Sequence, residues 1–91
     1  MTVTGVRLFA DQSGSAVVDI WKDSYANFPA TVADTITASA KPTLSAAAKY
    51  EDTTLTGWTT SLVAGDVLRF NVDSASTITR LTVSLTLTRS I

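Results

Sequence analysis

Apolar and polar residues alternate along the first part of the chain. Over residues 2–10, Val6 and Leu8 share one face, and this period of two is typical of a β-strand. Turn-forming residues occupy positions 11–14, and the β-branched and aromatic run of residues 15–21 follows at once. The pattern therefore predicts that these two segments pair as an antiparallel hairpin.

Two segments nearer the C-terminus alternate as cleanly. Residues 67–73 and residues 81–88 each place apolar side chains on one face and mostly polar ones on the other. This alternation predicts strands of a sheet with one buried and one solvated side. The residues expected to face the interior are Leu68, Phe70, Val72, Leu81, Val83, Leu85 and Leu87.

The middle of the chain is less regular. Residues 22–30 contain several turn formers and Pro29, which cannot donate to a sheet ladder, so they are predicted to form a long loop. Residues 46–51 favour a helix but are too few for an isolated one, and a loop is predicted there. Short strands are predicted at three places, residues 31–38, 42–45 and 53–58.

Short strands separated by turns, with no convincing helix, indicate an all-β fold. We expect a single domain over residues 1–91, because no linker, repeat or low-complexity tract divides the chain. The expected architecture is an antiparallel two-sheet β-sandwich, jelly-roll-like, with about seven or eight strands.

Composition and charge narrow the range of partners. With 45% hydrophobic and 16% charged residues the chain is expected to fold. Its formal net charge is −1 and its seven basic residues are scattered, so they form no stripe for a nucleic-acid backbone.

No cysteine is present to supplement a small core with disulfides, and contacts with neighbouring chains could supply the stability that the core lacks. No stretch reaches the roughly 18 apolar residues that cross a bilayer, so we expect a protein made in a cytoplasm without membrane insertion.

The residues available for chemistry argue against an enzyme. The absence of histidine and cysteine removes the common nucleophile systems and metal ligands, and no phosphate-binding loop occurs, so no catalytic residue, metal or cofactor is expected. A small hydrolase with two carboxylates, such as Asp19 or Asp52, is the alternative. Asp19 interrupts an apolar segment, and because burying an unpaired charge is costly we expect it to face outward rather than to form a buried pair with an arginine.

Aromatic residues are the remaining candidates for binding, because they stack on sugars and anchor protein interfaces. Trp21 and Trp58 are expected in the core or at its edge. Tyr25 and Tyr50 lie in predicted loops beside polar residues, which suits a polyol or a protein partner, although a tyrosine can equally hold its own loop in place. The candidate ligand-binding residues are Tyr25, Asp23, Asn27 and Tyr50.

Three stretches resemble a domain of bacteriophage virion proteins. They are residues 4–22 (TGVRLFADQSGSAVVDIWK), residues 52–60 (DTTLTGWTT) and residues 64–73 (AGDVLRFNVD). They are similar to the C-terminal β-sandwich domain of tail-fibre, tail-spike and decoration-type proteins, and the likeness covers most of the chain. The resemblance implies a non-enzymatic virion protein that contacts other virion proteins and a host-surface glycan, often as a homo-oligomer and above all a trimer.

One departure from that pattern bears on assembly. Related copies carry an additional apolar strand upstream of the segment that corresponds to residues 2–10. We therefore expect either that a neighbour fills the missing edge or that the chain is a piece of a longer protein, since an unpaired edge favours pairing. The alternative to a virion role is a free-standing carbohydrate-binding β-sandwich module.

Overall fold

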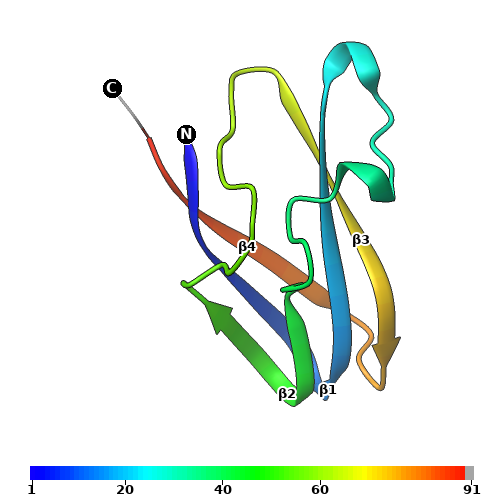
Figure 1. Cartoon of the computed structure of the whole chain (residues 1–91). Coiled ribbons are helices and arrows are strands. Elements are labelled where there is room, and N and C mark those ends of the chain that lie inside the picture. Colours follow the sequence, from blue (N-terminus) through cyan, green and yellow to red (C-terminus); the bar gives the residue numbers. More distant parts are fainter. Residues whose placement is uncertain (90–91) are drawn as a thin grey trace.

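The computed structural model describes residues 1–89, and hydrogen bonds join the strands of this part of the chain into one antiparallel sheet (Figure 1). Its elements are β1 (Thr2–Ser24), the 3-10 helices η1 (Tyr25–Asn27) and η2 (Val32–Asp34), β2 (Thr43–Asp52), β3 (Asp66–Ser76) and β4 (Leu81–Thr88). The predicted all-β, antiparallel class is confirmed. None of the helices in residues 1–89 is long and apolar enough to span a membrane.

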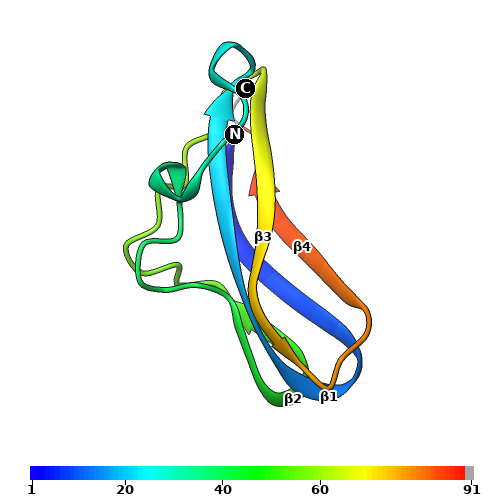
Figure 2. The ribbon, with the colours of Figure 1, turned by 90° about the vertical axis from the view of Figure 1, so that its right-hand side faces the viewer.

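The central strand β1 is bent. It runs from the N-terminus to the far end of the molecule, turns near residues 11–14 and runs back (Figures 1 and 2). β2 pairs with it along one edge, while the other edge pairs with β4 over the first half and with β3 over the second. The predicted hairpin is therefore wrong. The turn residues bend one long strand, and each half of that strand pairs with other segments instead of with the other half.

Asp11 ties this bend, the β1 elbow, to the connection between β3 and β4. Its carboxylate accepts hydrogen bonds from the Thr79 hydroxyl and from the backbone N–H groups of Arg80 (3.1 Å) and Thr79 (3.0 Å). These donors hold the pKa of Asp11 below its ordinary value, and the Thr79 hydroxyl has the largest effect. The neighbouring segments bend at the same level, because Ala46 in β2 (φ 48°) and Thr77 after β3 (φ 78°) both adopt left-handed backbone conformations.

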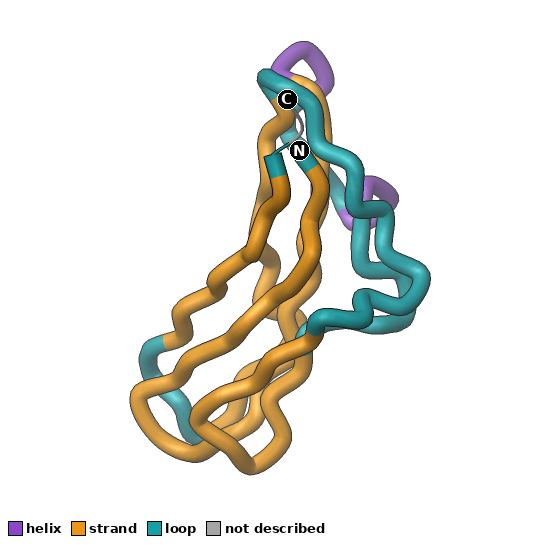
Figure 3. The backbone as a smooth tube through the Cα atoms, turned by 90° about the vertical axis from the view of Figure 1, so that its left-hand side faces the viewer, coloured by secondary structure: helices purple, strands orange, loops and turns teal. Residues whose placement is uncertain are grey.

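Figure 3 shows the backbone of both halves of the bent sheet, and both halves contribute residues to the hydrophobic core. Val3 and Val6 from the first half of β1 share one cluster with Ile20 from the second half. Leu8 likewise shares a second cluster with Val18, and both clusters include residues from the segments that flank β1. Ile36, Leu55, Trp58 and Leu62 of the first cluster come from the connections between the strands, so the bent sheet and these connections bury the core together.

The predicted number of strands is too high. Residues 1–89 form four strands in one sheet, because residues 2–10 and 15–21 merge into β1 and residues 46–51, predicted as a loop, continue β2. Residues 31–38 and 53–58, predicted as strands, form turns. Asp52 lies just before the second of these segments. Its carboxylate accepts hydrogen bonds from the backbone N–H groups of Thr54 and Leu55, and these bonds curl the chain. Such side-chain bonds compete directly with a sheet ladder.

Several residues predicted to face the interior do so only in part. Leu68, Leu81, Val83 and Leu85 pack against the core as expected. Phe70, Val72 and Leu87 lie opposite Ile20, Val18 and Val3 and therefore on the core side of the sheet, yet they remain 45%, 53% and 41% exposed. The prediction that these three side chains are buried is therefore wrong.

Asp19 is buried, contrary to its predicted outward position, with only 1% of its surface exposed. Its Oδ1 accepts hydrogen bonds from the hydroxyls of Thr35 (2.5 Å) and Thr37 (2.8 Å) and from the N–H of Ile20 (2.8 Å). Lys41 Nζ lies 3.7 Å from Oδ2. Burial alone would raise the pKa of Asp19, but these hydrogen bonds outweigh it and lower the pKa. The carboxylate therefore holds the segment that contains Thr35 and Thr37 against β1.

Gly14 sits where the β1 elbow touches the β3–β4 connection. A Cβ atom there would lie 2.5 Å from Ile78 Cγ2 and 2.6 Å from the Ser76 carbonyl, whereas at Gly5 the closest atoms are 3.5 Å away. We expect Gly14→Ala to lower the free energy of unfolding by about 1–3 kcal/mol, as overpacking does, and Gly5→Ala to change it little. Urea unfolding of both variants checks this, and equal effects would contradict the close contact.

Removing the Asp19 carboxylate leaves buried donors without an acceptor. We expect Asp19→Ala to lower the free energy of unfolding by about 2–4 kcal/mol near neutral pH. Because folding lowers the pKa of Asp19, the ionised carboxylate stabilises the fold above the unfolded value of about 3.9, and this contribution is lost as the pH falls through the folded value. The difference between wild type and variant should therefore shrink in acid. Unfolding curves from pH 7 to pH 3 with a constant difference would refute this role.

Candidate functional site

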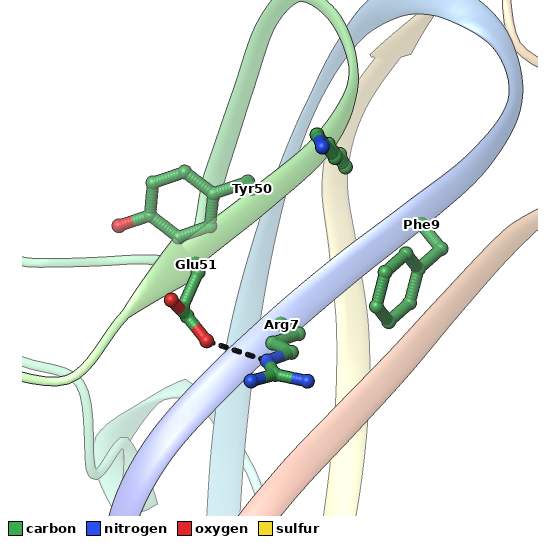
Figure 4. A pocket seen from close by; sticks show the side chains of 5 residues that line it. Arg7, Phe9, Tyr50 and Glu51 are labelled. Atoms are coloured by element: carbon green, nitrogen blue, oxygen red, sulfur yellow. Dashed lines mark hydrogen bonds and ion pairs between the residues drawn. The ribbon is translucent and has the colours of Figure 1, made fainter.

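A groove of about 440 Å³ lies on the outer face of the sheet where β1 meets β2 (Figure 4). The strand register produces it, because Arg7 lies opposite Glu51 and Phe9 lies opposite Lys49. Directly opposed residues of an antiparallel pair project from the same face, so these four side chains are neighbours. The residues that line the groove are Arg7, Phe9, Lys49, Tyr50 and Glu51.

The charges in the groove are accessible to solvent. Arg7 Nε donates a hydrogen bond to Glu51 Oε2 at 2.5 Å, and both side chains are about half exposed, at 55% and 51% (Figure 4). Such a pair contributes little to stability because water screens it. Phe9 is 43% exposed beside this pair. An open apolar ring next to a guanidinium and a carboxylate can stack on a ligand and hydrogen-bond to its hydroxyl groups.

Tyr50 forms the inner side of the groove. It alternates with Lys49 and Glu51 and lies opposite the buried Leu8, so its ring packs against both core clusters. Burial, together with the neighbouring Asp52 carboxylate, raises the pKa of the Tyr50 hydroxyl. Tyr50 therefore stays neutral and supports the groove from the core side.

The predicted ligand-binding residues do not form one site. Tyr50 lies in β2 rather than in a loop, whereas Tyr25 lies in η1 at the opposite end of the molecule and is 85% exposed (Figure 1). Asp23 and Asn27 shape this second region. Asp23 accepts a hydrogen bond from the N–H of Ser24 (2.8 Å), and the N–H of Asn27 donates to the Ser24 hydroxyl (3.3 Å). Both bonds fix the local turn.

Sequence reasoning missed four lining residues, Arg7, Phe9, Lys49 and Glu51. Alternation over residues 2–10 already places Arg7 and Phe9 on one face, and this was the available signal. The neighbouring strand β2, which carries Lys49 and Glu51, was not predicted, because residues 46–51 were expected to form a loop. Within residues 1–89, no group of three or more acidic, histidine or cysteine side chains is arranged to hold a metal ion.

A second feature is the β3–β4 side, which we define by the core-facing but exposed residues Phe70, Val72 and Leu87. Figure 2 views the molecule from this side, with β3 in front and β4 beside it. A hollow of about 540 Å³ adjoins it where β3 begins and β4 ends, and Leu68 and Leu87 contribute to its lining. Both strands pair only with β1 in the described part of the chain. The β3–β4 side therefore combines apolar surface with free strand edges.

Comparison of the chain with protein-family models, with curated proteins and with solved structures finds no match.

Proposed function

We propose that this chain is a non-enzymatic structural domain of a bacteriophage virion, of the tail-fibre, spike or decoration type. It acts in particle assembly, in attachment to the host surface, or in both. The resemblance of residues 4–22, 52–60 and 64–73 to such domains supports this role. The single observation that carries the proposal is the exposure of the β3–β4 side. A structural subunit contacts its neighbours through a surface that is exposed in the single chain and becomes covered in the assembly.

The exposed fractions of Phe70, Val72 and Leu87 are large for residues on the core side of a sheet. Fully burying one such side chain contributes about 1.5–3 kcal/mol, so covering the exposed parts of all three would contribute on the order of 2–4 kcal/mol. Clustered apolar surface beside unpaired edges is typical of contact sites. Neighbouring chains would thereby extend the bent sheet into the jelly-roll-like, two-sheet sandwich expected from the sequence.

The virion role predicts that the chain is part of purified particles. We expect its peptides in particles of the phage that encodes it, in constant ratio to the other virion proteins across a density gradient. Quantitative mass spectrometry of the gradient fractions measures this. Peptides confined to the soluble fraction of the lysate would end the proposal.

The groove favours a second candidate function, the binding of a glycan. Its exposed Phe9 ring offers a stacking surface, and the half-exposed Arg7 and Glu51 offer a donor and an acceptor at its side. This combination suits the apolar face and the hydroxyl groups of a sugar. Glycan binding is compatible with host attachment and with a free-standing carbohydrate-binding module.

A comparison of two exposed aromatic residues tests the glycan site. We expect Phe9→Ala to weaken binding on a glycan array by about tenfold or more, since about 1.4 kcal/mol of stacking corresponds to that factor. Tyr25→Ala is the matched control, because Tyr25 is exposed at the other end of the molecule, and it should leave binding unchanged. Loss of binding in Tyr25→Ala alone would move the site to η1, and no binding by wild type would remove this function.

A further inference from the structure

The free edge of β3 presents backbone groups at defined residues. On the opposite side of β1, Val18 N–H donates to the Pro42 carbonyl (3.0 Å), so the backbone groups of Val18 point away from β3. Val18 lies opposite Val72. Because hydrogen-bonded and non-bonded pairs alternate along an antiparallel ladder, the N–H and C=O of Val72 point to the free edge of β3.

The same reasoning applies two residues earlier in β3. The Ile20 carbonyl accepts a hydrogen bond from Ile36 N–H (2.9 Å), and Ile20 lies opposite Phe70. Phe70 therefore also directs its N–H and C=O outward. Asn71 lies between Phe70 and Val72, directs its backbone groups to β1 and so forms a non-bonded position at the free edge.

The sequence of β3 is complementary to itself around Asn71. When β3 pairs antiparallel with a second copy of itself in the register centred there, Phe70 lies opposite Val72 of the second copy, which is the hydrogen-bonded position derived above. Arg69 then lies opposite Asp73 of the second copy. The twofold axis repeats each of these contacts once. This register therefore contains two apolar pairs of Phe70 with Val72 and two oppositely charged pairs of Arg69 with Asp73.

Other registers lack this match. Centring on Phe70 places Arg69 opposite Asn71, and centring on Val72 places Asp73 opposite Asn71. Centring between two residues would bring core-facing side chains opposite solvent-facing ones. The pairing ends at Asp73, because β3 bulges there between the residues that pair with Val18 and Val17.

We propose that β3 pairs with β3 of a second copy of this chain about a twofold axis at Asn71. The pairing would place Phe70 and Val72 of both copies in one contiguous row and cover part of the β3–β4 side. It deepens the proposed assembly role and rests on it for its context. It also differs from the trimer that the resemblance implies, because a strand pairs antiparallel with its own copy only about a twofold axis.

Charge exchange across the edge tests the register. We expect Arg69→Asp and Asp73→Arg each to weaken self-association by about tenfold or more, since each places like charges opposite one another. An equimolar mixture of the two variants should associate again, because one chain then carries two acids and the other two arginines at the paired positions. Sedimentation velocity over a range of concentrations measures both effects, and Arg89→Asp is the control for an exposed arginine outside β3.

The mixing experiment separates pairing from folding. Arg69 lies 5.3 Å from the centre of the Trp21 ring, and Asp73 is bonded to Lys41, so either change could disturb the chain itself. Such damage would not be repaired by adding the other variant. Failure of the mixture to associate, or a trimer as the only assembly of wild type, would overturn the proposal.

A cysteine at the twofold axis provides a second measurement. The chain has no cysteine, and a non-bonded antiparallel pair brings its Cα atoms to about 4.5 Å, within the range for a disulfide. Under mild oxidation, Asn71→Cys should form a covalent dimer, whereas Thr82→Cys on β4 should not. Equal crosslinking of both variants, or none at Asn71→Cys, would contradict the pairing. A monomer that is nevertheless found in virions would leave the proposed function standing and remove only this contact.

Discussion

The rest of the structure depends on the β1 elbow and on the carboxylate that holds it. The bend brings residues from both halves of the sheet into the same core clusters, and the segments beside β1 bend at the same level. Asp11 couples the elbow to the β3–β4 connection through three hydrogen bonds, and Gly14 allows the two backbones to come close there. This local contact holds the bend around which the two halves of the sheet and the strand connections pack.

The same bend explains why apolar surface stays open at one edge. β3 and β4 leave a common connection and pair with different halves of β1, so in residues 1–89 each of them is an outer strand with β1 as its one paired neighbour. Phe70, Val72 and Leu87 therefore lie at the rim of the core and keep large exposed fractions. The exposed apolar surface thus follows from where the bent sheet ends.

Alternation in the sequence predicts both halves of β1, although as a hairpin rather than as one strand, and it predicts β3 and β4, because burial along a strand repeats every two residues. It fails for residues 46–51, where alanine, lysine and glutamate favour a helix locally while pairing with β1 imposes a strand. Because this strand was not predicted, the groove residues Lys49 and Glu51 were not identified. Asp19 could not be placed either, since its partners Thr35 and Thr37 reach it only after the chain has turned back along β1.

The two candidate surfaces face different directions and make different demands on the chain. The groove lies on the outer face of β1 and β2. The pairing of these two strands fixes the positions of its residues without a partner molecule. The β3–β4 side leaves apolar side chains of the core face exposed, and in residues 1–89 its two strands pair with β1 alone. Under the proposed function, neighbouring chains would cover the β3–β4 side while the groove remained open to a ligand.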